Sequence, residues 1–518
     1  MPPATAFLYP PLRLRAALPR AEFLWLGALL LAFLLAVLAS DMNGYQGSDD
    51  ARYVAGAEAW LAEGLHVARN HWETRLPYVL LIALCGTSPG ALLALHLALG
   101  MALVVVSWAL ARPVVGARPA MAFAALLALS PFVQQLSGRL AIEALELLLA
   151  AGAFWLVRQR LAGAGMAQLA WAGVLLGLAI LTRQTSAALA IGLGLMLVLR
   201  GRWRDAFILA GIAALPVVAE ALFYTVLTGD PLARLHIDMR HVQVEGQPLP
   251  GGAYTAASPL FNADLASKWQ NTTQGMLHLH WTVDAFLRLV TYPSGLLTWL
   301  PALALLGWPR LVFAGQAPGL RRDLLLTMAA VYVVVVFVLS LAPEPRYFAM
   351  ATYLACLVVA LGLARLAEVL PRLALAALAA LALAGPVVAD LNPTPRGVVP
   401  QLVAQLQARP ATVFHVSGPV EAAARLALRQ AGLAGWVSGP SPVAGALLFA
   451  MPGNDQPDLA ASCADGRPRL REVWRGVTSP SLAWRLAEVT RTSALLPAGL
   501  ARWLERERYR PALFAVGC

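Results

Sequence analysis

Repeated apolar runs of about 20 residues, the length that spans a bilayer as a helix, constrain this chain more than any other feature. Of its 518 residues, 59% are hydrophobic and only 13% are charged. Soluble proteins of this size are seldom built in this way. The composition therefore predicts a polytopic, all-α membrane protein, and it argues against a soluble enzyme or a nucleic-acid-binding protein.

We expect about eleven transmembrane helices, joined mostly by short connections. Their predicted bounds are 22–40, 88–111, 119–136, 139–157, 168–181, 184–199, 206–227, 286–307, 323–341, 346–364 and 372–389. Arginines gather in alternate connections, such as Arg158 with Arg160 and Arg200 with Arg202. Because cytoplasmic connections carry the excess of positive charge, the N-terminus is predicted to be cytoplasmic and the C-terminus extracytoplasmic.

Composition also predicts two domains, a membrane domain over 1–390 and an extracytoplasmic α/β domain over 391–518. Two long outer loops, 41–87 and 228–285, belong to the first domain. The second alternates short apolar segments with amphipathic ones, so we expect strands at 412–416 and 446–450 and helices at 420–430 and 482–488. In an oxidising compartment, Cys463 and Cys518 are expected to form a disulfide, and the alternative is two unpaired thiols.

The first outer loop opens on the acidic turn Ser48-Asp49-Asp50-Ala51-Arg52-Tyr53. Charge so close to a bilayer is costly to desolvate and points to function. Equally, Ser48 is a good N-cap for a helix over 49–63, and the two acids then offset its dipole. A carboxylate beside a guanidinium can also take a proton while the arginine holds an anion such as a phosphate.

Further charges fall near the same predicted face of the membrane. Glu143 follows Ser137-Gly138-Arg139 at the outer end of a predicted span, and Glu146 lies one turn deeper. Each of these acids can be interpreted as a functional group. The alternative is a carboxylate whose side chain simply reaches the membrane–water interface. The turn at 343–347 places Arg346 and Tyr347 on that face, and the alternative there is an ordinary helix stop.

These residues resemble the integral-membrane GT-C glycosyltransferases, in the branch of the protein O-mannosyltransferases and the lipid A aminoarabinose transferases. Ser48–Tyr53 stands where that family has an acidic Asp-Glu-x-x-Tyr-like motif, and Glu73-Thr74-Arg75-Leu76-Pro77 stands where it has a Lys-Pro-Pro-Leu-like segment. Glu143 matches an acid at the start of the fourth span, and Arg346-Tyr347 matches a late Arg-Tyr pair. The resemblance covers roughly residues 20–390.

The resemblance implies transfer of a sugar from a polyprenyl-phosphate donor to a lipid, glycan or protein acceptor, with inversion at the anomeric carbon. It implies catalytic roles for Asp49 as general base and for Asp50 and Glu143 in positioning the acceptor or, in some relatives, a divalent metal. The substrate-binding residues that it implies are Arg52, Tyr53, Glu73, Arg75, Arg139, Arg346 and Tyr347. Arg52, Arg75 and Arg346 would hold the lipid phosphate.

A different class of function fits the same composition, namely a transporter or flippase of a lipid-linked sugar. Transporters place ionisable residues near the midplane and often have related halves. Here the charges gather at the outer face and no internal repeat is evident, so we favour a glycosyltransferase of the cell envelope. We expect it to reside in a bacterial-type inner membrane as a multi-pass protein.

Overall fold

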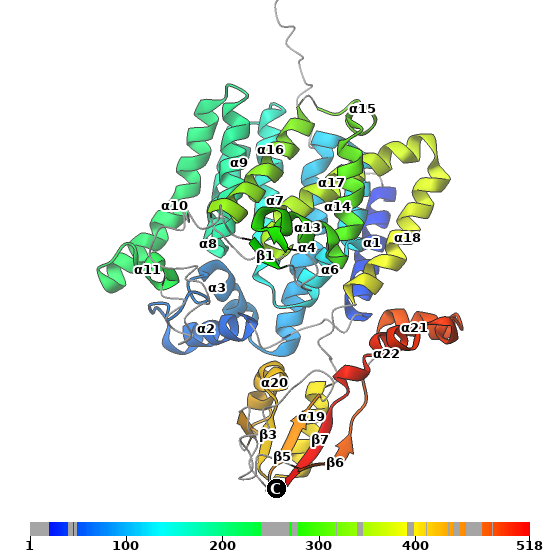
Figure 1. Ribbon diagram of the computed structural model, residues 1–518. Coiled ribbons are helices and arrows are strands. Elements are labelled where there is room, and N and C mark those ends of the chain that lie inside the picture. The colour runs from blue at the N-terminus through cyan, green and yellow to red at the C-terminus, as the bar shows by residue number, and fades with distance from the viewer. Residues whose placement is uncertain are drawn as a thin grey trace, which may run out of the picture.

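The structure, a computed structural model, is mostly helical, with a small sheet near the C-terminus (Figure 1). It describes residues 20–39, 45, 49–239, 269–271, 278–317, 319–338, 345–390, 398–410, 412–433, 436–438, 445–451, 469–478 and 480–517. Both cysteines of the expected disulfide, Cys463 and Cys518, lie outside these residues.

A bundle of apolar helices forms the larger part of the molecule. It consists of α1 (Arg20–Ala39), α4 (Pro89–Val115), α5 (Ala117–Leu129), α6 (Pro131–Gly138), α7 (Ile142–Leu161), α8 (Met166–Thr182), α9 (Ala187–Val198), α10 (Trp203–Thr228), α13 (Trp281–Thr291), α14 (Pro293–Leu306), α15 (Pro309–Val312), α16 (Leu320–Val333), α17 (Ala349–Val369) and α18 (Pro371–Ala389). Within the described ranges, five helices are long and apolar enough to cross a membrane, or six if the bent pair α5–α6 is one span. Each predicted span overlaps a helix of this bundle, and the count of eleven stays a prediction.

Proline divides two of the predicted spans. The chain bends by 55° between α5 and α6, where Ser130 precedes Pro131 in an extended conformation. Tyr292 is likewise extended before Pro293, so the span predicted at 286–307 is two helices. Proline disfavours the helical conformation in the residue before it and lacks the amide hydrogen that a continuous helix needs. The span at 323–341 also changes form, because α16 passes into a π-helix at Val334–Val338.

Helix α17 lies at the centre of the bundle and is buried along most of its length. Its Tyr353 accepts a hydrogen bond of 2.7 Å from the indole of Trp155 on α7 and donates one of 2.8 Å to Ser107 on α4. Buried hydroxyl and indole groups need such partners. The three helices are therefore held together by a polar contact as well as by apolar packing.

Several arginines of the predicted cytoplasmic connections are paired with acids at the same end of the bundle. Asp323 of α16 is fully buried and forms ion pairs with both Arg158 and Arg200. Asp205 of α10 pairs with Arg160 at 3.1 Å and with Arg202 at 2.6 Å. These arginines thus also fasten helices to one another.

The first outer loop folds against the opposite end of the bundle. The predicted helix over 49–63 is present as α2 (Asp49–Glu63), and α3 (Leu76–Cys85) follows a turn. Of the second outer loop, the structure describes the short helix α11 (Ala233–Met239) and the strands β1 (Trp269–Asn271) and β2 (His278–His280), which pair in antiparallel.

The C-terminal α/β region, residues 398–517, lies beyond α2 and α3 (Figure 1). Its sheet has the order β4-β3-β5-β7-β6, with β3 parallel to β4 and β5, and β7 antiparallel to β5 and β6. The strands are β3 (Phe414–Val416), β4 (Trp436–Ser438), β5 (Leu447–Ala450), β6 (Arg469–Arg475) and β7 (Ala512–Gly517), and the helices are α19 (Val398–Ala408), α20 (Gly418–Gln430), α21 (Leu482–Val489) and α22 (Ala498–Leu504). The two expected strands and two expected helices match β3, β5, α20 and α21.

Candidate functional site

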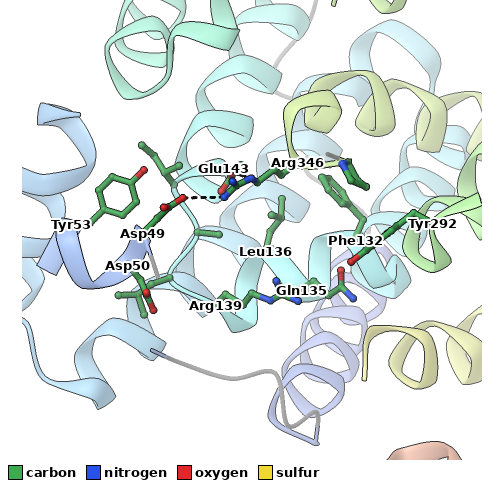
Figure 2. A pocket seen from close by; sticks show the side chains of 14 residues that line it. Asp49, Asp50, Tyr53, Phe132, Gln135, Leu136, Arg139, Glu143, Tyr292 and Arg346 are labelled. Carbon is green, nitrogen blue, oxygen red and sulfur yellow. Dashed lines mark hydrogen bonds and ion pairs between the residues drawn. The ribbon is translucent and has the colours of Figure 1, made fainter. Parts of the chain in front are cut away.

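A cavity of about 320 Å³ opens where the N-terminus of α2, the connection between α6 and α7, and the α17 segment meet (Figure 2). We use the name α17 segment for α17 together with the short 3₁₀-helix Pro345–Phe348 that precedes it. Three stretches distant in sequence therefore share one space. The side chains that line it come from Asp49, Asp50, Tyr53, Phe132, Gln135, Leu136, Arg139, Leu140, Ala141, Ile142, Glu143, Tyr292, Pro345 and Arg346.

The acidic turn supplies two carboxylates to this cavity. Asp49 begins α2, and its Oδ2 accepts a hydrogen bond of 3.0 Å from Nη1 of Arg346. Asp50 is buried, with Oδ1 accepting from the amide of Ala51 at 3.0 Å. Acids in the first turn of a helix are favoured by its dipole, so offsetting the dipole and lining the cavity are compatible roles. The expected N-cap, Ser48, lies outside the described residues.

Glu143 reaches the cavity from the first turn of α7 and forms an ion pair with Arg183, the residue after α8. Arg183 also lies 3.7 Å from Glu146, which accepts hydrogen bonds from Thr185 and Ser186 at 2.6 and 2.8 Å. Burial opposes the charge on Arg183, but the two glutamates outweigh burial and hold its pKa above the usual value.

Arg346 joins these groups into one chain of alternating charge. Its Nε lies 4.0 Å from Glu143 while Nη1 holds Asp49. Tyr347 places its ring against the guanidinium groups of both Arg183, at 4.6 Å, and Arg346, at 5.3 Å. We call the series Asp49, Arg346, Glu143, Arg183 and Glu146 the acid–arginine chain.

Arg139 and Tyr292 line another part of the cavity (Figure 2). Arg139 ends α6, where the extended backbone before α7 directs the chain back along the site. Burial lowers its pKa, and the neighbouring Tyr292 and Glu143 partly offset that effect. The cavity thus carries positive charge on two sides.

The predicted substrate-binding residues of the first outer loop lie in different places. Tyr53 lines the cavity and packs edge-to-face on Tyr78, with ring centroids 5.0 Å apart. Arg52 instead stacks over the ring of Trp72 at 3.6 Å.

Glu73 and Arg75 do not line the cavity. Glu73 is buried in its own turn, where it accepts hydrogen bonds from the amide of Arg69 at 2.7 Å and the side chain of Asn70 at 2.9 Å. Nη1 of Arg75 is buried and makes no hydrogen bond within the described part of the chain, and burial lowers the pKa of this guanidinium.

Sequence reasoning did not include Arg183, Glu146 or Asp238 among the site residues. Arg183 had a usable signal, because it is a lone arginine between two apolar runs on the face predicted to be poor in arginine. Asp238 of α11 accepts hydrogen bonds from Thr74, at 3.0 Å, and from Gln184. Nothing in its local sequence indicates those distant partners.

The arrangement does not fit a divalent metal. Among the described residues, no three His, Cys, Asp or Glu side chains gather closely enough to hold an ion. Asp49 and Glu143 each face a guanidinium, whose positive charge would repel a cation at that position. The carboxylates are instead matched to arginines.

Comparisons with known proteins agree with the resemblance. Residues 69–227 match the family described as dolichyl-phosphate-mannose-protein mannosyltransferase. The crystal structure of ArnT from Cupriavidus metallidurans bound to undecaprenyl phosphate superposes with a TM-score of 0.55 at 12% identity, covering 96% of this chain and 98% of that one. The predicted resemblance to GT-C glycosyltransferases is confirmed.

At that level of identity, the likeness to ArnT shows a shared fold. The zinc and sulfate complex of the Archaeoglobus fulgidus oligosaccharyltransferase gives a TM-score of 0.49 at 16% identity, over 76% of this chain and 61% of that one. No curated protein sequence matches the chain.

Proposed function

We propose that the protein is a membrane glycosyltransferase that moves a sugar from a polyprenyl-phosphate donor to an acceptor on the extracytoplasmic face. The observation that carries this proposal is the pairing of Asp49 and Arg346 in one cavity at the end of an apolar bundle. A base and an anion-binding group are thereby close enough to serve the two ends of one displacement.

In the proposed step, a carboxylate oxygen of Asp49 accepts the proton of the acceptor group while the acceptor atom attacks the anomeric carbon. The new bond to the sugar forms as the bond between the anomeric carbon and the phosphate oxygen breaks. That oxygen leaves with the electron pair, so the product is polyprenyl phosphate. A single in-line displacement inverts the anomeric configuration. Asp50 and Glu143 orient the acceptor and Asp49.

The leaving phosphate is held by Arg346, which lines the cavity, while Arg75 lies outside the cavity lining and adds positive charge from behind it. Arg346 is about two-fifths exposed at the cavity, and Nη1 of Arg75 is a buried donor with no hydrogen bond among the described residues. Arg139 adds positive charge, and Tyr347 orients Arg346 through its ring. A doubly charged phosphate competes well for guanidinium groups, because such hydrogen bonds are charge-assisted. We assign Arg52 and Glu73, which are engaged with Trp72 and the adjacent turn, to shaping the loop.

The proposed setting is a bacterial-type inner membrane, with the N-terminus in the cytoplasm and the C-terminal α/β region outside. The positions of the charged groups support it. Helix α2, whose first residues line the cavity, lies at the opposite end of the bundle from the connection between α9 and α10, which carries Arg200 and Arg202 (Figure 1). A reporter fused to the C-terminus should be active only outside the cytoplasm. Cytoplasmic activity would overturn both the topology and the proposed side of catalysis.

The function is tested by incubating the purified full chain with a panel of polyprenyl-phosphate sugars and candidate acceptors. Release of free polyprenyl phosphate that depends on both substrates would support the proposal. The Asp49→Asn variant is the matched control, since it keeps the size of the side chain. Equal release by the variant, or none by the wild type on any donor, would count against the proposal.

A further inference from the structure

Helix α20 of the C-terminal α/β region has apolar side chains on two opposite faces. Val420, Ala424 and Leu428 follow a four-residue spacing and are buried in the core of the region's own sheet. That stripe satisfies the usual need of a surface helix to cover a sheet. Leu426 lies on the other side of the helix, since it is two residues, or about 200°, from Ala424. It is only 1% exposed, although its own sheet does not cover it.

Leu426 belongs instead to the apolar core of the helical bundle. Arg429 and Gln430, on the same side of α20 as Leu426, contact the first outer loop. Arg429 forms an ion pair of 3.0 Å with Glu58 of α2, and the side-chain amide of Gln430 donates to the carbonyl of Thr87 at 3.5 Å. Figure 1 shows α20 as the part of this region that lies next to α2 and α3.

Tyr45 of the first outer loop packs against the apolar core of the bundle. Its hydroxyl is buried and makes no hydrogen bond within the described residues. Burial raises the pKa of Tyr45 to about 12, with Asp50 adding to the rise and Arg425 and Arg429 of α20 opposing it. The phenol therefore lies within electrostatic reach of both the acidic turn and α20.

We propose that α20 is a positioning helix, which docks on α2 and so holds Asp49 and Asp50 in register with Arg346 and Glu143. The effect on catalysis rests on the proposed function, whereas the docking of α20 on α2 does not. Asp49 and Glu58 lie on one helix of 15 residues, so a shift at one end of α2 is carried to the other. The C-terminal region would then affect the transfer step more than the binding of donor.

The docking is tested by charge reversal and exchange in the full chain. Arg429→Glu places a carboxylate opposite Glu58, and hydrogen exchange of the α2 amides should then quicken by about fivefold, the upper end for one exposed ion pair. The double variant Glu58→Arg with Arg429→Glu restores opposite charges and should return exchange to near the wild-type rate. Leu426→Ala should also quicken exchange in α2 while leaving β3 and β5 protected, because Leu426 is not in the sheet core.

The matched control is the exposed pair Glu472 and Arg475 on β6 of the same region. Reversing either of those charges should leave α2 unchanged. If Arg429→Glu behaves like this control, or if the double variant fails to restore protection, the docking is disproved.

Measurements of transfer activity show whether α20 positions the site residues or only stabilises the fold. With an undecaprenyl-phosphate sugar that the wild type accepts, Arg429→Glu should lower kcat with little change in the KM for donor, and the double variant should recover kcat. A rise in KM alone would overturn the positioning role. If the wild type transfers no sugar from any donor, the proposed function fails, while the exchange data still decide whether α20 docks.

Discussion

Nη1 of Arg346 donates to Oδ2 of Asp49 across 3.0 Å, and both side chains are about two-fifths exposed. An ion pair with that exposure contributes at most about 1 kcal/mol to stability. Arg346 can therefore leave Asp49 for another anion. The donor phosphate, a singly charged diester, offers Arg346 a second anionic partner for charge-assisted hydrogen bonds. On this basis, donor binding would release the Asp49 carboxylate, and we expect the donor to bind before the acceptor is activated.

Replacing Asp49 by Asn removes the proton acceptor but keeps an oxygen at the start of α2. Because Asn and Asp are similar at helix N-termini, the unfolding temperature should hardly change. Transfer activity should fall by ~10²–10⁴-fold, as for loss of a positioned base. Steady-state rates and thermal unfolding of the same preparation check this prediction. Wild-type turnover by a folded Asp49→Asn protein would remove Asp49 from the mechanism.

Arg346→Gln should weaken the binding of undecaprenyl phosphate. Hydrogen bonds to charged groups contribute roughly 1.5–3 kcal/mol, which corresponds to a dissociation constant higher by about 10- to 100-fold. Titration followed by intrinsic tryptophan fluorescence measures it. Arg475→Gln, which removes an arginine from the exposed surface of β6, is the control and should bind like the wild type. Equal affinities would contradict the phosphate role.

Asp323→Ala should destabilise the bundle strongly. The change leaves Arg158 and Arg200 without the carboxylate that both of them contact. Uncompensated buried charge of this kind costs about 3–5 kcal/mol. Thermal unfolding in detergent should show the loss, whereas Glu368→Gln, at the exposed pair with Arg365, should stay close to the wild type. A similar unfolding temperature for the two variants would show that this triad does not fasten the helices.

Gly385→Ala tests the packing of α18 on the bend between α5 and α6. A Cβ at Gly385 would overlap the carbonyl oxygen of Leu129, so we expect a cost of about 1–3 kcal/mol. A Cβ at Gly194 of α9 would meet no atom within 4 Å, and Gly194→Ala should therefore be neutral or stabilising, by up to ~1 kcal/mol. Thermal unfolding distinguishes them, and the opposite order would refute the close approach.

Local features of the fold were predictable because they depend on neighbouring residues. The start of α2 follows from the acids in its first turn. The breaks at Pro131 and Pro293 follow from proline chemistry that the apolar pattern conceals, and the predicted spans missed them. Hydropathy averages over a window, so the spans predicted at 119–136 and 286–307 run through both prolines. The predicted span at 286–307 is therefore divided in the structure.

The contacts of the site were less accessible to sequence reasoning. That Glu143 and Arg346 meet Asp49 requires the packing of α2, α7 and the α17 segment, which no local pattern specifies. Glu73 matched a motif position, yet its oxygens accept hydrogen bonds from Arg69 and Asn70 within one turn. The contacts of Arg183 with Glu143 and Glu146 likewise depend on how α7 packs against the end of α8.

The pairing of Asp49 with Arg346 also has a consequence for biogenesis. The two residues are 297 positions apart, and at about 5–20 residues per second the ribosome needs about 15 to 60 s to make the intervening chain. During that time Asp49 is already made and its arginine does not yet exist. A nascent chain arrested before Arg346 therefore cannot bind phosphate through this pair, and the protein gains its proposed site only late in synthesis.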